Sequence, residues 1–163
     1  MQPQACREQF ARCLGEESEL LATLEQQLLR EYELLTTNDI EGLENASGAR
    51  QQTVAKLLRV DDDRRGLCRA RNLEADARGL ATLLAWCDAT GTLAVPQARC
   101  AELAQRCRAQ NERNGALVTA RLNRVNGMLG MMGGENLSRT YQSGNSTRAT
   151  NHQPMGRMVS TSA

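Results

Sequence analysis

The stretch Leu14–Leu35, LGEESELLATLEQQLLREYELL, carries a leucine at every seventh residue. Such a repeat is typical of a helix that packs lengthwise against parallel or antiparallel partners. The pattern predicts a first helix from about Gln4 to Leu35, whose apolar stripe is interrupted by Glu17 and Glu31. The leucines of the repeat are Leu14, Leu21, Leu28 and Leu35.

A break follows at Thr36–Asp39, where Asn38 or Asp39 can cap the start of a second helix. A short connection after a long helix predicts an antiparallel hairpin. The second apolar stripe is weaker, because Ser47 and Arg50 occupy inward-facing positions. Its expected members are Ile40, Leu43, Ser47, Val54, Leu57 and Leu58.

The run Asp61–Arg65 contains only charged residues. It is either a solvated part of a long helix or a docking patch, and the solvated interpretation is favoured.

A shorter helix is expected near residues 74–88, and Pro96 suits the first turn of a last helix, because proline lacks an amide hydrogen.

Apolar residues recur along this last helix at steps of three and four residues as far as Met132. Asn114 lies on the same line, where it either fixes the register of the seam or marks where the seam opens to water. Met128, Met131 and Met132 widen the stripe with flexible side chains, which suit a surface that binds partner helices. Ordinary core packing is the competing interpretation.

Composition points to the same fold class. The chain has 163 residues with one Trp, two Tyr and one Phe, and abundant Leu, Ala, Glu, Gln and Arg, which favour helices over sheets. We expect an all-α fold, an antiparallel bundle of three long helices plus one shorter helix with coiled-coil-like packing. The last helix should break at Gly133-Gly134, giving a bundle over residues 1–132 and a disordered polar tail over residues 133–163.

Charge and hydropathy limit the partners. The net charge is +1 with acids and bases interleaved, so nucleic acid is not expected. No apolar run approaches the roughly 20 residues that span a bilayer, so membrane insertion is not expected. The N-terminus lacks the pattern of a signal peptide, which favours a cytoplasmic protein.

The six cysteines do not predict a disulfide or a metal site. Within each of the pairs Cys6/Cys13 and Cys100/Cys107 the spacing is about 10.5 Å along a helix, beyond the reach of a disulfide. They are better interpreted as small buried apolar residues. The single histidine, His152, lies in the expected tail, so neither a catalytic triad nor a metal ligand set is credible. We therefore expect no enzyme activity and no cofactor.

One segment resembles a known family. Asn111, Asn114 and Gly115, the helix to Met132 and then Thr140–Gly144 resemble the C-terminal region of the FlgN family, although Gln142 replaces the glycine that usually follows the tyrosine. FlgN proteins are flagellar type III export chaperones for hook-associated proteins. The resemblance implies that this chain binds the terminal amphipathic helix of such proteins and delivers them to the membrane protein of the export gate.

Two groups of residues are the candidates for these contacts. Tyr141 is the candidate for docking to the export gate, as the resemblance implies. The expected substrate-helix residues are Asn111, Asn114, Leu117, Val118, Leu122, Val125, Met128, Leu129 and Met132.

Two alternative functions remain open. One is a structural bundle that self-associates through Leu14–Leu35, and the other is a regulatory adaptor that binds another helical protein; homo-oligomerisation is left open.

Overall fold

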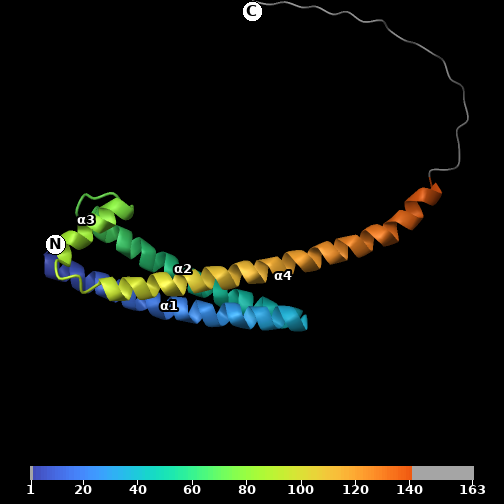
Figure 1. The fold of residues 1–163 in the computed structure, drawn as a ribbon, viewed down its shortest axis with the longest axis horizontal. Coiled ribbons are helices and arrows are strands. Elements are labelled where there is room, and N and C mark those ends of the chain that lie inside the picture. The colour runs from blue at the N-terminus through green and yellow to red at the C-terminus, as the bar shows by residue number, and fades with distance from the viewer. Residues whose placement is uncertain (1, 141–163) are drawn as a thin grey trace, which may run out of the picture. The chain divides into compact units, whose positions relative to one another are not determined.

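The computed structural model describes the backbone of residues 2–140 and the side chains of residues 2–132. Its elements, in chain order, are α1 (Pro3–Thr37), α2 (Ile40–Arg69), α3 (Ala77–Cys87) and α4 (Ala94–Thr140) (Figure 1). Three helices are long and one is short, and residues 2–140 contain no strand. The all-α prediction is confirmed.

Contacts divide the chain into two units after Leu122, within α4. The first unit holds α1, α2, α3 and the part of α4 up to Leu122, and the second begins at Asn123. The expected helix break at Gly133-Gly134 is wrong, because α4 runs to Thr140. Glycine lowers helix propensity but keeps its amide donor, so the ladder of backbone hydrogen bonds can continue through it. The boundary between residues 132 and 133 stays a prediction.

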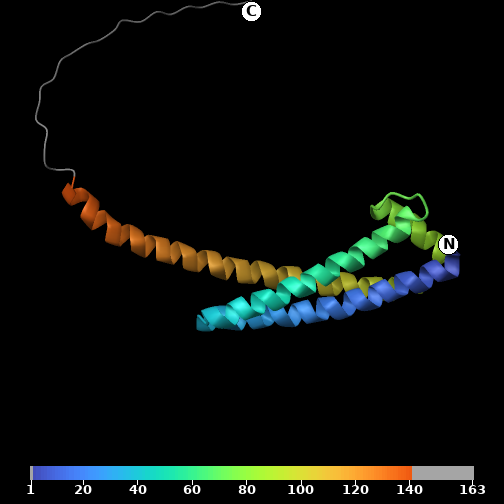
Figure 2. The same ribbon diagram turned by 180° about the vertical axis from the view of Figure 1, so that it is seen from behind.

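The connection between α1 and α2 takes only two residues. Asn38 ends α1 in the left-handed conformation, with φ of 61°, which asparagine tolerates better than most residues. The Asp39 carboxylate accepts a hydrogen bond of 2.9 Å from the Gly42 amide and so caps α2, as its position predicts. α1 and α2 consequently lie side by side and antiparallel (Figure 1; Figure 2 shows the pair from behind).

Two ion pairs fix the register between α1 and α2. Arg64 of α2 approaches Glu17 at 3.0 Å, and Arg50 approaches Glu31 at 2.8 Å. Between the two pairs, the residue number rises by fourteen on α1 and falls by fourteen on α2, which is the signature of antiparallel helices matched over two heptads. The glutamates that interrupt the apolar stripe of α1 therefore pair with arginines of α2.

α4 lies along α1 in the same direction, and three side chains of α4 record the alignment. Each donates a hydrogen bond to the backbone carbonyl of the α1 residue 86 positions earlier in the sequence. The donors are Cys100 to Leu14 at 3.3 Å, Cys107 to Leu21 at 3.3 Å and Asn114 to Leu28 at 2.8 Å. A constant offset over two heptads means that α1 and this part of α4 are parallel and in register.

The buried face of α2 differs from the expected one. Ile40 is 68% exposed, Leu58 is 65% exposed and Val54 is 38% exposed, so these three predictions were wrong. The face that packs on α1 follows a heptad pattern with steps of three and four residues, in which arginine and threonine take core positions. Its members are Leu43, Ala46, Arg50, Thr53, Leu57, Val60, Arg64 and Leu67, all buried or half-buried.

α3 covers one end of the core of the first unit. Cys6 and Phe10, both fully buried, lie at this end. Asp76 caps α3 through a 2.7 Å hydrogen bond from the Gly79 amide. Gly79 has no room for a side chain, because a Cβ there would collide with the Glu74 carbonyl. Leu83 of α3 is fully buried in the same cluster.

Asp88 connects α3 to α4. Its carboxylate accepts hydrogen bonds from the Leu93 amide at 2.8 Å and from the Thr92 hydroxyl and amide at 2.7 and 3.0 Å. These bonds, led by the one from Leu93, hold the pKa of Asp88 below its usual range. An ionised Asp88 beside the first turn of α4 also suits the helix dipole.

Candidate partner-helix interface

The residues of α4 in the first unit become exposed toward Leu122. Asn111 is exposed, Leu117 is half-buried, and Val118 and Leu122 are exposed. Arg113 and Arg121 attach this segment to α1. The Arg113 guanidinium lies 4.3 Å from the centroid of the Tyr32 ring and donates to its hydroxyl at 3.1 Å. Arg121 donates to the side chain of Asn38 at 3.1 Å.

Asn114 is not on the exposed surface. It is only 5% exposed, its amide nitrogen is bonded to Leu28, and its side-chain oxygen accepts a 3.0 Å hydrogen bond from Gln110. Of the two roles considered for this residue, the structure supports fixing the register and not an opening of the seam to water. Asn114 can support a binding surface only indirectly, by holding α4 in place.

The expected binding residues in the second unit are all exposed. Leu129 is 61% exposed, and its apolar neighbours along the helix are exposed by at least half. Apolar side chains gathered on one exposed helix face are typical of an interaction site. This set consists of Val125, Met128, Leu129 and Met132. Tyr141 lies outside the described residues.

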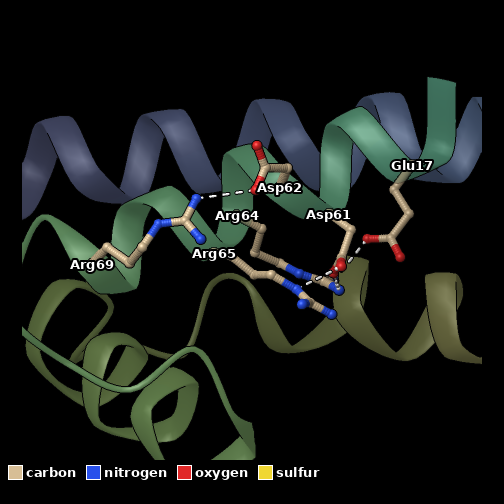
Figure 3. A network of polar contacts seen from close by, with 6 residues as sticks. All are labelled: Glu17, Asp61, Asp62, Arg64, Arg65 and Arg69. Atoms are coloured by element: carbon tan, nitrogen blue, oxygen red, sulfur yellow. Dashed lines mark hydrogen bonds and ion pairs between the residues drawn. The ribbon is translucent and has the colours of Figure 1, made fainter. Parts of the chain in front are cut away.

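The charge run Asp61–Arg65 lies within α2, and Asp62, Asp63 and Arg65 are exposed, as the solvated interpretation predicts, while Asp61 and Arg64 are half-buried in an ion network (Figure 3). Arg64 contacts both Glu17 of α1, at 3.0 Å, and Asp61, at 2.8 Å. Asp61 also contacts Arg65 at 2.7 Å, and Asp62 contacts Arg69 at 3.0 Å. Because Arg64 and Asp61 are partly buried, this network supports the seam between α1 and α2.

All six cysteines are buried and free, as their interpretation as apolar residues predicts. Burial raises the pKa of Cys13, Cys68, Cys100 and Cys107. For Cys6, burial and then a hydrogen bond with the Cys87 thiol raise the pKa to about 11. Protonated, buried thiols are poor nucleophiles, so these residues serve packing.

Sequence reasoning missed an open groove between α2 and α4, whose floor is Leu24 and Leu28 of α1. Its volume is about 240 Å³, and a second hollow continues from it along α2 as far as Leu58. No signal in the sequence marks this groove, because it depends on the register of three helices. The walls are Arg50, Gln51, Val54, Ala55 and Leu58 of α2, and Cys107, Arg108 and Asn111 of α4.

Within residues 2–132 no group of acidic, cysteine or histidine side chains has the geometry of a metal site. In the described part of the chain, no helix has both the length and the apolar character needed to cross a membrane. What this part of the chain does offer is apolar helix surface beside a register-locked bundle. Exposed apolar helix surface is typical of sites that bind partner helices.

The family model for FlgN protein matches residues 1–149. The chain therefore belongs to the FlgN family, whose members are chaperones of flagellar export. The match extends the resemblance from the C-terminal segment to nearly the whole chain. The searches of curated proteins and of solved structures returned no match for this chain.

Proposed function

We propose that this chain is a cytoplasmic chaperone that binds the terminal amphipathic helix of flagellar hook-associated proteins. The observation that carries this proposal is the run of exposed apolar residues on α4, from Val118 to Met132, in a member of the FlgN family. A bound substrate helix would cover these residues and hide its own apolar face, which prevents premature assembly. Neither nucleotide nor cofactor is required for this action.

Release must remain feasible for export. An amphipathic helix that folds on binding loses part of the interaction free energy to its own ordering, which keeps the affinity moderate. The three methionines on α4, Met128, Met131 and Met132, can adapt to substrate helices of different shape. A chaperone of this kind can therefore serve more than one hook-associated protein.

Delivery to the export gate is assigned in this proposal to Tyr141. A tyrosine offers a large contact area and a hydroxyl at little cost in rotamer entropy. Tyr141→Ala should leave substrate affinity unchanged and weaken binding to the membrane protein of the export gate. Secretion assays of hook-associated proteins, with Tyr141→Phe as the conservative control, measure this effect. Normal secretion by the alanine variant would exclude the role of Tyr141.

The direct test of the chaperone function is co-purification of the full chain with hook-associated proteins of the same bacterium, with the filament protein as control. We expect a stable complex with hook-associated protein only. Light scattering over a concentration series distinguishes this function from a self-associating structural bundle. A complex with a helical protein unrelated to flagella, and none with hook-associated protein, would instead support the adaptor alternative.

A further inference from the structure

The charges of the chain are distributed unevenly along its sequence. Residues 1–112 carry 14 arginine and lysine residues against 18 acidic residues, a net charge of −4. Residues 113–163 carry six arginines and a single acidic residue, Glu135, a net charge of +5 with histidine counted as neutral. The near-neutral total is thus the sum of an acidic and a basic part, and such asymmetry is typical of chains that bind an anionic partner.

The arginines that begin this basic part have no carboxylate partner among the described side chains. Arg113 contacts the ring and hydroxyl of Tyr32, and Arg121 donates to the side chain of Asn38, so the partners of both are neutral groups. Arg124, in the second unit, is exposed. None of the ion pairs within residues 2–132 involves any of these three arginines. Their positive charge is therefore available to an anionic partner.

The second unit combines this charge with a broad apolar face. Its five exposed apolar residues spread over about 160° of the helix circumference, at about 100° per residue. All are at least half exposed, and Met131 is the most exposed of them, at 76%. A seam with one partner helix uses a narrower stripe, whereas a face of this width suits contact with an extended apolar phase. The five residues are Val125, Met128, Leu129, Met131 and Met132.

Arg124 and Met131 lie together at one edge of this apolar face, because residues seven positions apart differ by only about 20° around a helix. The other side of the helix carries Asn123, Asn126 and Gly127, which have no charge. An arginine at such a border can lay its aliphatic stem on apolar surface and keep its guanidinium in a polar layer. This arrangement is typical of helices that lie at the surface of a membrane.

We propose that residues 123–132 of α4 bind the surface of a membrane that contains anionic lipids. The helix lies along the surface without crossing it, with Met128 and Met131 at the boundary between headgroups and acyl chains and Arg124 paired with lipid phosphates. The other arginines of residues 113–163 add electrostatic attraction to the same surface. This inference goes beyond the proposed function, which requires no lipid and assigns no role to Arg124.

The spacing of the arginines favours a lipid surface over an acidic protein. A protein partner would have to present carboxylates at matching fixed positions, whereas an anionic leaflet attracts every basic residue near it. Nucleic acid offers phosphates but no apolar phase to cover the methionines. The six arginines lie 3 to 15 positions apart without a repeat, at Arg113, Arg121, Arg124, Arg139, Arg148 and Arg157.

The test is sedimentation of the full chain with lipid vesicles. The probes are vesicles of equimolar phosphatidylglycerol and phosphatidylcholine, and vesicles of phosphatidylcholine alone. We expect binding to the anionic vesicles and at least about tenfold weaker binding to the neutral ones, because the neutral vesicles lack the electrostatic attraction. Binding to the anionic vesicles should weaken as the salt concentration rises, since salt screens this attraction.

Two variants identify the surface that contacts the lipid. Arg124→Glu should weaken binding to the anionic vesicles by about tenfold, because it reverses a charge near the surface. Met131→Gln should weaken it by about threefold or more, because a polar side chain replaces an apolar one at the headgroup boundary. The matched controls, Arg12→Glu on α1 and Asn126→Gln on the polar side of the second unit, are also at exposed positions and should bind as the wild type does. Circular dichroism checks that each variant keeps its helical content.

The outcomes separate this inference from the proposed function, because the vesicles contain no protein. If the wild-type chain does not sediment with anionic vesicles, the inference is overturned and the chaperone function is unaffected. If Arg124→Glu and Met131→Gln bind as well as their controls, residues 123–132 are not the lipid contact and the inference is likewise overturned. If no vesicle is bound but Arg124→Glu lowers the affinity for hook-associated protein, the charge serves a protein partner instead.

Discussion

Asn114 shows how one side chain specifies the alignment of two long helices. Its position two heptads after Cys100 would ordinarily take an apolar residue. Both its amide nitrogen and its oxygen have hydrogen-bond partners, Leu28 and Gln110, so its burial costs little. A shift of α4 by one turn would leave this amide buried without the Leu28 carbonyl. The residue therefore disfavours alternative registers.

Asn114→Asp should lower the free energy of unfolding by about 2 kcal/mol or more, because the amide donor is lost and a carboxylate faces the Leu28 carbonyl. Urea denaturation followed by circular dichroism measures the change. Asn111→Asp is the control, since Asn111 is exposed three residues away, and it should change stability by less than about 0.5 kcal/mol. Equal effects of the two substitutions would contradict the register role of Asn114.

Cys6 links stability to alkaline pH. In the folded chain its pKa is raised to about 11, against 9.0 for an unperturbed thiol. Between these values the unfolded chain loses the proton that the folded chain keeps, so stability falls as pH rises from about 9 to about 11. Chemical denaturation at several pH values should show a smaller slope for Cys6→Ala than for the wild type. An unchanged slope would mean that Cys6 ionises freely in the fold.

The heptads of α1 and α4 could be recognised in the sequence because most of their core positions carry leucine or cysteine. The core face of α2 was not, because Arg50 and Arg64 occupy core positions and Ile40 and Leu58 lie outside them. Hydrophobic periodicity detects burial of apolar residues and not burial of ion pairs. In the sequence, only Glu17 and Glu31 in the apolar stripe of α1 indicated that a neighbouring helix must supply polar partners.

The candidate site could likewise be predicted only in part from the sequence. The spacing along α4 identified its exposed apolar residues, but periodicity alone could not separate the exposed part from the buried part, which depends on where α1 ends. The groove beside Val54 was beyond sequence reasoning, because it requires the register of three helices. Tertiary packing, and not helix propensity, decides both features.

The ion pair between Arg50 and Glu31 can be tested as a unit. Arg50→Leu alone should cost about 2–3 kcal/mol, because it leaves the Glu31 carboxylate, in a residue only 8% exposed, without its partner. The double variant Glu31→Leu/Arg50→Leu should be near wild type or more stable, since no buried charge then remains. Thermal and urea denaturation of both variants measure this. If the double variant is clearly less stable than the wild type, the pair is a net stabilising contact and the prediction is wrong.

Two features of the molecule bear on its proposed function. A register-locked bundle holds α4 against α1 through the carbonyl contacts of Cys100, Cys107 and Asn114. Apolar residues of the same helix remain exposed from Val118 to Met132. Membership of the FlgN family gives these residues their proposed partner, the terminal helix of a hook-associated protein.

The most direct test of this account is the affinity of the double variant Val125→Asp/Leu129→Asp for hook-associated protein, measured by calorimetry. We predict a loss of at least about a hundredfold, as expected when two central apolar contacts are replaced by charges, with helical content unchanged because both residues are exposed. The control Ala120→Asp/Asn123→Asp adds the same charge on the opposite side of α4 by helical spacing and should bind normally. Unfolding of the first variant, or wild-type affinity in it, would contradict the assignment of α4 as the substrate-binding surface.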